Sequence, residues 1–261
     1  MKIDRDIFIK DGFILIKNLF STEEVENYKR LLLKVSRSNL EDLEDNAKWE
    51  EVDGVSKRKE FWPLIYNKKL LNVLRTLVPS PPQYLQFSDL HVNVDSVGWH
   101  RDLYYNKLLV GDDAKKIGVL RVGMYFHSYE DNNFKMGFLP GTHFSTSLLN
   151  KLENRVWSLF RKMTGKLPFY YFFSKPKWLK IDAGDCMIFD TRILHTGSAI
   201  TGQKLAIYTA YGEDNNELSR SQVDYLHSRK DLNYSHCSHE LAKVLREKDL
   251  MSKYLIEKPL E

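Results

Sequence analysis

The residues best suited to bind a metal ion are those of a His-x-Asp triplet, His100 and Asp102, and a distant histidine, His195. The triplet follows a strand-like run, so one imidazole and one carboxylate lie within reach of the same ion. A second imidazole from a distant strand completes a facial triad and leaves three coordination positions open, as in non-haem Fe(II) oxygenases. A lone His-x-Asp triplet also occurs as a simple surface pair, so the surrounding sequence must decide between the two interpretations.

The segment around His195 favours the metal-binding interpretation. A Gly184-Asp185 turn leads into an apolar strand-like run, and His195 follows it just before another turn. Lys204 then opens the last strand-like run, Leu205 to Tyr211. A cation at the start of that strand would lie beside the metal, where it could bind a carboxylate.

The elements that would position these residues are predicted from the spacing of apolar residues. Residues 1–82 are predicted to be mostly helical, and a capping box at Ser21 and Glu24 opens one of the helices. The strongly acidic stretch from Asn39 to Asp53 is predicted to be a solvated loop or a helix surface. From Tyr84 to Tyr211, short strand-like runs are separated by turns, which indicates an antiparallel sandwich or barrel.

Composition is that of an ordinary globular protein, with 43% hydrophobic residues, 28% charged residues and a net charge of +4. No apolar run approaches the ~18 residues that span a bilayer. The N-terminus lacks the apolar segment of a signal peptide, and the two cysteines cannot form a disulfide framework. We therefore expect one cytoplasmic domain over residues 1–261. Its predicted parts are a helical N-terminal part (1–82), a mainly β core (83–212) with an insertion at 150–180, and a helical tail (213–261).

Four segments follow one another along the chain: Phe8 to Glu24, Trp99 to Tyr105, Phe138 to His143 and Gly184 to Gly197. They resemble the opening strand and helix, the His-x-Asp segment, the Pro-Gly-Ser/Thr-His turn and the distal histidine of one family. This is the phytanoyl-CoA dioxygenase-like (PhyH) branch of the Fe(II)/2-oxoglutarate-dependent oxygenases, and the resemblance covers nearly the whole chain.

The resemblance implies a mainly β fold with helical flanks, built on a double-stranded β-helix (jelly-roll, cupin-like) core. It implies that His100, Asp102 and His195 are the iron ligands and catalytic residues. It also implies that the enzyme uses Fe(II) and the co-substrate 2-oxoglutarate, with ascorbate as a supporting reductant. Lys204 stands where the family has an arginine that pairs with the far carboxylate of 2-oxoglutarate. Lysine can hold that carboxylate as a point charge but not as a bidentate fork.

Two further residues are candidates for the 2-oxoglutarate site. Arg121 is a charge in a strongly apolar run. It either faces outward from the sheet or is buried against 2-oxoglutarate or an anionic substrate, because an unpaired buried charge is too costly to keep. Asn93, near the end of the run from Tyr84 to Val94, is assigned to the same site. The sequence leaves open whether Lys204 or Arg121 anchors the co-substrate.

The reaction implied by the resemblance is hydroxylation of an aliphatic carbon, with release of succinate and CO₂. Related halogenases carry Ala or Gly at the position of Asp102, so the carboxylate favours hydroxylation, or another oxidation such as desaturation, over halogenation. Two alternatives stay open. One is a cupin-type metalloenzyme that does not use 2-oxoglutarate, and the other is a non-catalytic relative that binds a membrane or a partner.

The positive charge is concentrated in residues 150–180, which hold eight lysines and arginines, one acidic residue and eight aromatic residues. This composition suits a lid or docking surface for an amphiphilic anion, such as an acyl thioester or a phospholipid. The alternative is an insertion that packs on the core with its lysines in solvent. We expect a small-molecule or lipid-like anionic substrate, peripheral membrane contact through this segment, and no nucleic-acid partner. The oligomeric state is not predicted.

The remaining histidines are predicted to be structural. His143 is expected to stabilise the Pro-Gly-Thr-His turn, and His91 and His127 are expected to be satisfied within strands. The run from His236 to His239 lacks a second cysteine pair at zinc spacing, so we expect the start of a surface helix with a serine cap.

Overall fold

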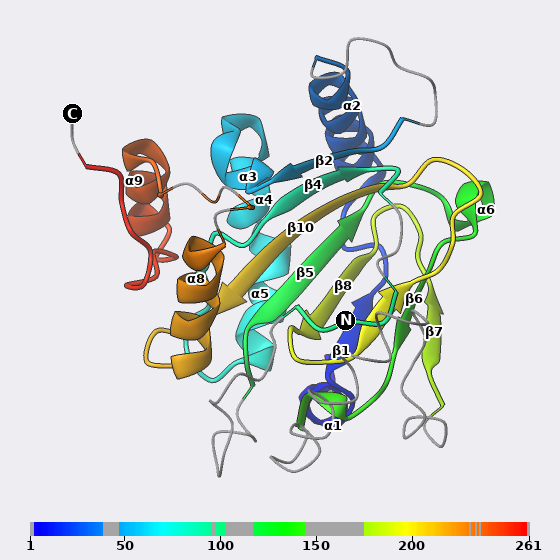
Figure 1. Cartoon of the computed structure of the whole chain (residues 1–261). Helices are drawn as coiled ribbons and strands as arrows, with labels where there is room; N and C mark the ends of the chain where they lie inside the picture. Colours follow the sequence, from blue (N-terminus) through cyan, green and yellow to red (C-terminus); the bar gives the residue numbers. More distant parts are fainter. Residues whose placement is uncertain are drawn as a thin grey trace.

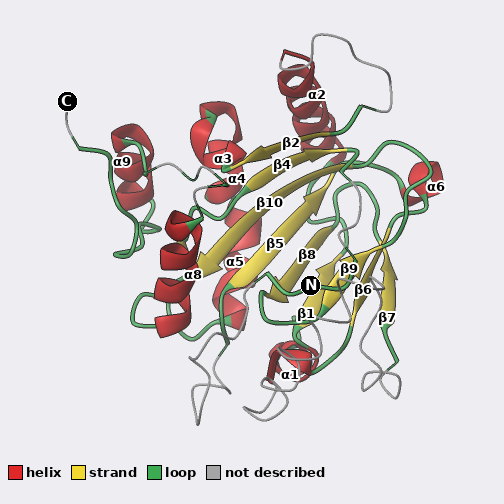
Figure 2. Ribbon diagram, in the orientation of Figure 1, coloured by secondary structure: helices red, strands yellow, loops and turns green. Residues whose placement is uncertain are grey.

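Two antiparallel sheets form the centre of the protein (Figures 1 and 2). The computed structural model describes residues 3–38, 47–94, 98–102, 117–144, 175–229, 231–232, 234 and 236–259. Within them, the larger sheet has the strand order β1-β8-β5-β10-β4-β2, with β3 paired to β10, and the smaller has the order β7-β6-β9. The strands of the larger sheet are β1 (Phe13–Ile16), β2 (Trp49–Val52), β3 (Gln83–Tyr84), β4 (Asp89–Val92), β5 (Leu120–Tyr125), β8 (Cys186–Asp190) and β10 (Leu205–Gly212). Those of the smaller sheet are β6 (Lys135–Phe138), β7 (Lys177–Lys180) and β9 (His195–Gly197).

Helices flank the larger sheet at both ends of the chain. The N-terminal ones are α1 (Arg5–Asp11), α2 (Thr22–Ser38), α3 (Gly54–Lys57), the 3₁₀ turn η1 (Lys59–Phe61), α4 (Trp62–Ile65) and α5 (Lys68–Leu77). The later ones are α6 (Tyr129–Asn132), the 3₁₀ turn η3 (Thr142–Phe144), α8 (Glu217–Ser228) and α9 (His239–Glu247). Among the described residues, no helix is both long and apolar enough to cross a membrane. The predicted mainly β core with helical flanks is confirmed.

The two faces of the larger sheet bury different partners, because successive side chains of a strand point to opposite faces. On β5, Val122 and Met124 belong to the main apolar cluster, which includes Leu32 and Leu74 of the helices. Tyr125, of opposite parity to Met124, belongs to a second cluster that includes Phe138 of the smaller sheet. The second cluster therefore fills the space between the sheets, and the functional residues described below lie at its open end.

The predicted capping box opens α2. The Glu24 side chain accepts a hydrogen bond from the backbone N–H of Ser21 at 2.8 Å, and Ser21 Oγ accepts one from the backbone N–H of Glu24 at 3.3 Å. Two of the N–H groups that no helical carbonyl can satisfy are thus paired. This part of the sequence prediction is confirmed.

Two predicted elements are wrong in detail. Residues 49–52, expected to be a solvated loop or helix surface, form the edge strand β2, which pairs with β4. The acidic composition hid a strand with only one face against the protein, while residues 39–46 of that stretch lie outside the described residues. The run from Tyr84 to Val94 is not one strand, because Gln86 takes a left-handed φ of 56° that separates β3 from β4.

Gly12 joins α1 to β1 through a contact that excludes a side chain. It ends the helix with φ 85°, and its backbone N–H donates to the carbonyl of Phe8 at 2.7 Å. A Cβ added there would lie 2.4 Å from Nδ1 of His143, whose Nε2 donates to the carbonyl of Ile9 at 3.0 Å. His143 therefore has a structural role, as predicted. Its hydrogen bond to Ile9 also fixes α1 against the Pro140-Gly141 turn, which precedes His143 in the chain.

We expect Gly12→Ala to destabilise the protein more than Gly141→Ala. Both glycines have a positive φ, but a Cβ at Gly141 would have its nearest neighbour, the carbonyl oxygen of Lys10, 3.6 Å away. Gly141→Ala should cost about 1–2 kcal/mol from the left-handed backbone alone. Gly12→Ala should cost roughly 1–3 kcal/mol more, because His143 must move. Urea unfolding measures both, and equal losses would contradict the contact.

Candidate active site

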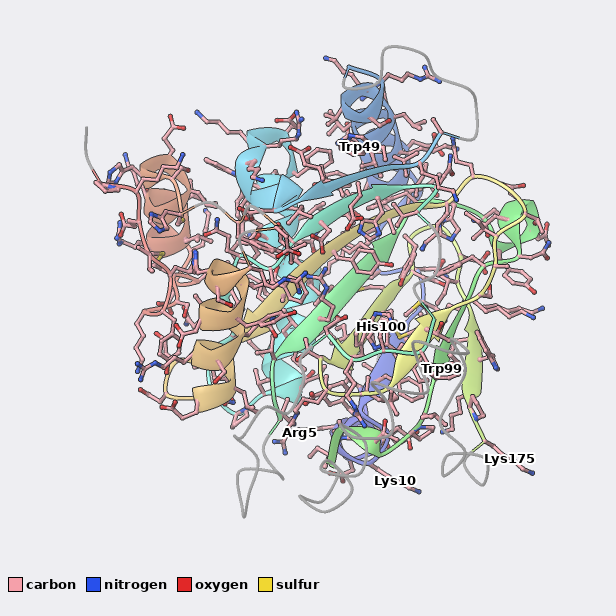
Figure 3. All side chains as sticks on the ribbon, in the orientation of Figure 1. Arg5, Lys10, Trp49, Trp99, His100 and Lys175 are labelled. Carbon is pink, nitrogen blue, oxygen red and sulfur yellow. The ribbon has the colours of Figure 1, made fainter. Side chains whose placement is uncertain are left out.

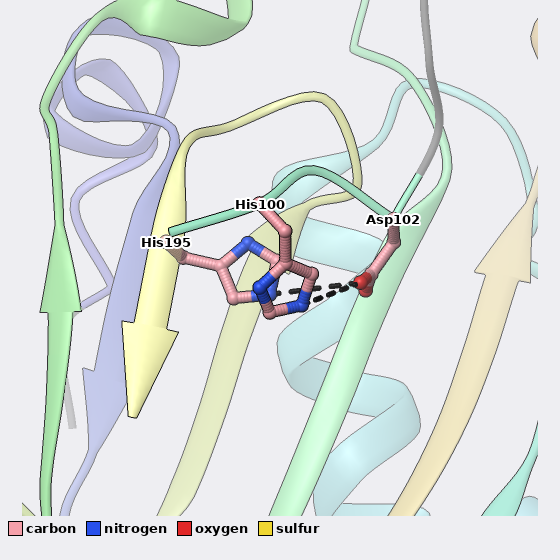
Figure 4. A group of neighbouring side chains, drawn as sticks. All are labelled: His100, Asp102 and His195. Carbon is pink, nitrogen blue, oxygen red and sulfur yellow. Dashed lines mark ion pairs between the residues drawn. The ribbon is translucent and has the colours of Figure 1, made fainter. Parts of the chain in front are cut away.

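His100, Asp102 and His195 come together at the open end between the sheets (Figure 4). Their potential ligand atoms all lie within 4.8 Å of one another. Oδ1 of Asp102 is 3.5 Å from Nε2 of His100 and 3.6 Å from Nε2 of His195. Within the described part of the chain, no other group of three His, Cys, Asp or Glu residues is close enough to hold a metal ion.

Backbone pairing aligns the two histidines. The N–H of His100 donates to the carbonyl of His195 at 2.9 Å, and the N–H of His195 donates to the carbonyl of His100 at 3.0 Å. The N–H of Asp102 donates to the carbonyl of Thr191 at 2.9 Å. Between them, the buried Arg101 donates to the carbonyl of Thr142 at 2.8 Å and to that of Arg192. The His-x-Asp segment is therefore fastened to the strand that carries His195.

Each histidine presents Nε2 to the cluster because its other ring nitrogen is occupied. Nδ1 of His100 donates to the carbonyl of Gly98 at 2.8 Å, and Nδ1 of His195 donates to that of Ile193 at 3.0 Å. This arrangement fixes the tautomer and the ring orientation, as in established metal sites. The lone pair of each Nε2 is directed at the space beside Asp102.

The protonation states also fit a metal ion. Burial, with the neighbouring His100, lowers the pKa of His195 to about 4 and keeps this imidazole neutral at neutral pH. Burial alone would raise the pKa of Asp102, but His195, His100 and Arg121 hold it well below its ordinary value. Metal ligands must be deprotonated, and the neutral imidazole of His195 and the carboxylate of Asp102 meet this requirement.

A cavity of about 300 Å³ opens beside the cluster. Its walls combine apolar side chains with charged ones. The described residues that line it are Glu50, Phe87, Asp89, His91, Val94, His100, Asp102, Arg121, Phe134, Met136, Phe189, His195, Gly197, Lys204 and Tyr208. Figure 3 shows the side chain of His100 over the strands near the centre of the molecule, with Trp99 beside it. The space suits a small organic acid next to a metal ion.

Lys204 lies in the cavity wall immediately before β10. It is buried, its Nζ donates to the carbonyl of Val94 at 3.1 Å, and it lies 4.4 Å from the ring centroid of Phe134. Asn93 fixes its backbone, because Oδ1 of Asn93 accepts from the N–H of Lys204 at 2.9 Å. Among the described residues, Asn93 is not part of the cavity lining, and its Nδ2 donates to the carbonyl of Ala47 at 3.2 Å.

Arg121 is buried rather than outward-facing, with 5% of its surface exposed. It forms an ion pair with Asp89, and its Nε lies 3.8 Å from Oδ2 of Asp102. The structure therefore supports the interpretation in which the Arg121 side chain is buried, and not the one in which it faces outward from the sheet. The partners of Arg121 are carboxylates of the chain itself.

The phytanoyl-CoA dioxygenase (PhyH) family model matches residues 8–207, a range that contains His100, Asp102, His195 and Lys204. The chain belongs to the phytanoyl-CoA dioxygenase family. No curated protein matches it by sequence.

Solved structures share its fold. The non-haem α-ketoglutarate-dependent epimerase SnoN of nogalamycin biosynthesis is 13% identical, with a TM-score of 0.60 over 80% of this chain and 79% of SnoN. The carbocyclase SnoK of the same biosynthesis is 17% identical, with a TM-score of 0.60 over 79% and 82%. HygX from Streptomyces hygroscopicus, solved with nickel and 2-oxoglutarate, is 18% identical, with a TM-score of 0.52 over 79% and 84%. The predicted jelly-roll core is confirmed, and family and fold together support a non-haem iron- and 2-oxoglutarate-dependent oxygenase.

The cavity residues of this PhyH family member that were not predicted include His91 and Glu50. His91, expected to be structural, lies in the cavity wall with its ring centroid 5.0 Å from that of Tyr208. Its Nε2 is 3.3 Å from Oε1 of Glu50. Glu50 could not be placed from the sequence because β2 was not recognised.

The basic insertion mostly lies outside the described residues, which include only Lys175 to Lys180 of it. In this part, Trp178 is 45% exposed and Lys177 forms an ion pair with Asp11 at 2.7 Å.

The predicted serine cap near His236 is confirmed, because Oγ of Ser238 accepts from the N–H of Leu241 at 3.2 Å.

We expect His127 to make stability depend on pH. Its Nδ1 accepts from the N–H of Leu205 at 3.1 Å, next to Lys204, and burial lowers its pKa to about 4. Between pH 6.5 and 4 the unfolded chain binds a proton that the folded chain does not, so stability falls as pH falls through that window.

His127→Asn keeps an acceptor near Nδ1 but does not titrate. Between pH 7 and 4.5 the natural protein should therefore lose about 2–3 kcal/mol more unfolding free energy than the variant. Urea unfolding at both pH values measures this difference. Parallel losses in the two proteins would show that His127 is not buried in its neutral form.

Proposed function

We propose that this PhyH family member is an Fe(II)- and 2-oxoglutarate-dependent dioxygenase that hydroxylates an aliphatic carbon of a small or lipid-like, anionic molecule. Succinate and CO₂ are the products of the co-substrate. The observation that carries the proposal is the convergence of His100, Asp102 and His195 on one point beside a cavity whose wall also contains a buried lysine.

The triad would hold the metal through Nε2 of His100, Nε2 of His195 and Oδ1 of Asp102. Bound there, Fe(II) would supply the oxygen activation that hydroxylation needs and that no amino-acid side chain provides. The contribution of the chain is the geometry. Hydrogen bonds to the carbonyls of Gly98 and Ile193 keep both rings aimed at the ion, and the three ligands leave the remaining positions open.

Lys204 is the proposed anchor of the far carboxylate of 2-oxoglutarate. Its ammonium group is buried beside Phe134, in surroundings that strengthen a charge–charge interaction because they exclude water. Asn93 supports it by holding the start of β10 in register with β4. Asn93 therefore contributes to co-substrate binding through the backbone of Lys204.

Hydroxylation is favoured by the presence of Asp102. A carboxylate ligand occupies the position that a halide needs in the halogenases of the wider group, so halogenation is not proposed. The structural neighbours include an epimerase and a carbocyclase. For this chain we assign the simplest outcome, transfer of a hydroxyl group.

An anionic substrate is supported by the described end of the basic insertion. Lys175 and Lys180 are exposed, and the exposed ring of Trp178 lies between them, with its centroid 5.9 Å from that of Trp99 next to the triad. Lys175 is visible beyond the end of β7 in Figure 3. An exposed tryptophan flanked by lysines is suited to an amphiphilic anion or an anionic membrane surface.

We expect the protein, given Fe(II) and ascorbate, to convert 2-oxoglutarate slowly to succinate without added substrate, and faster when a library compound is a substrate. His100→Ala should abolish both rates, because the ion loses one of three ligands. His236→Ala, which removes an exposed histidine elsewhere, should retain them. Succinate release measured by mass spectrometry provides the test.

Iron binding without any succinate release would favour the cupin-type alternative. Absence of iron binding in the natural protein would favour a non-catalytic relative and would contradict the proposed function.

A further inference from the structure

Arg121 connects the triad to a second buried carboxylate. It lies on β5, the strand between β8 and β10, and its guanidinium spans the gap between Asp102 and Asp89. Nη2 pairs with Asp89, Nη1 donates to the carbonyl of Phe87 at 2.6 Å, and Nε faces Asp102 at 3.8 Å. All three of its nitrogen atoms therefore face acceptors of the chain.

The guanidinium is also fixed in its plane. Its central carbon lies 3.6 Å from the ring centroid of Phe87 on one side and 5.3 Å from that of Tyr208. Asp89 is held in turn, because its Oδ1 lies 3.5 Å from the hydroxyl of Tyr234. A buried arginine with partners on every edge cannot turn toward a ligand without leaving a buried carboxylate unpaired.

The two oxygens of Asp102 consequently have different surroundings. Oδ1 faces Nε2 of both histidines, while Oδ2 faces Nε of Arg121. A carboxylate with one oxygen in an ion pair with an arginine presents the other to a metal ion. Such a contact around a ligand typically changes metal affinity by about 10- to 100-fold.

We propose that Arg121 is a positioning residue of the metal site: it holds Oδ2 of Asp102 so that Oδ1 alone is presented to the ion, and it leaves Lys204 as the anchor of 2-oxoglutarate. This inference rests on the proposed function. Arg121 and Lys204, both buried in the cavity wall, then have different roles: Arg121 positions a metal ligand and Lys204 binds 2-oxoglutarate. The sequence alone could not distinguish these roles.

The test measures Co(II) affinity and 2-oxoglutarate affinity separately, by titration calorimetry, in Arg121 and Lys204 variants. Arg121→Lys keeps a cation but cannot reach both carboxylates, so it should weaken Co(II) binding by roughly 10-fold or more. Its Co(II) absorption spectrum should also change, because Oδ2 of Asp102 becomes able to bind the ion. Lys204→Met should leave Co(II) affinity within about twofold and weaken 2-oxoglutarate binding to the Co(II) protein by roughly 10- to 100-fold.

Loss of Arg121 alone would leave Asp89 buried without its cation, so a charge-balanced variant is included. Arg121→Met combined with Asp89→Asn removes the pair together, and its thermal unfolding shows whether it is folded. In the folded double variant, Co(II) binding should again be weakened and the spectrum changed.

Three results bear on the proposal and the proposed function separately. Natural Co(II) affinity and spectrum in both Arg121 variants would overturn the positioning role. Weakened 2-oxoglutarate binding in the Arg121 variants, with none in Lys204→Met, would make Arg121 the anchor and also overturn it. Absence of Co(II) binding in the natural protein would instead overturn the proposed function.

Discussion

The site depends on one short stretch of backbone pairing. His100 and His195 are far apart in the sequence, and the two hydrogen bonds between their main chains set the separation of the rings. Because the bonds are made by the backbone, they leave each imidazole free to donate a hydrogen bond from Nδ1 to a local carbonyl and to turn Nε2 toward Asp102. The larger sheet, the turn at Thr142 and the side chain of Arg101 all serve to bring these two strand ends together.

The charged side chains of the cavity wall also lie in contact with other polar groups of the chain. Among the described residues, the cavity wall contains two cations and three carboxylates. Glu50 is exposed, and burying any of the others without a partner would be unfavourable. Arg121 is matched by Asp89 and Asp102, and Glu50 lies against His91. Lys204 lies in the same wall, and its Nζ donates to the carbonyl of Val94 at 3.1 Å.

Local spacing was enough to predict the capping box of α2 and the mainly β core, because Ser-x-x-Glu and strand alternation each depend on a few neighbouring residues. The grouping of His100, Asp102 and His195 was predicted from the motifs together with their resemblance to the PhyH family, because His195 is distant in the sequence from the His-x-Asp triplet. The sequence could not predict β2, because an edge strand rich in acidic residues resembles a solvated loop until its partner β4 is known. The roles of His91 and Arg121 were hidden for the same reason. Which carboxylate each of them meets depends on strand order, and strand order is a property of the whole sheet.

The central claim is that one metal ion binds between His100, Asp102 and His195, with 2-oxoglutarate reaching to Lys204. A crystal structure of the protein soaked anaerobically with Co(II) and 2-oxoglutarate tests it directly, through the anomalous signal of the metal. We expect a single strong peak in contact with both Nε2 atoms and with Oδ1 of Asp102, and a carboxylate of 2-oxoglutarate against Nζ of Lys204. A peak elsewhere, or a co-substrate whose far carboxylate lies against Arg121, would contradict it.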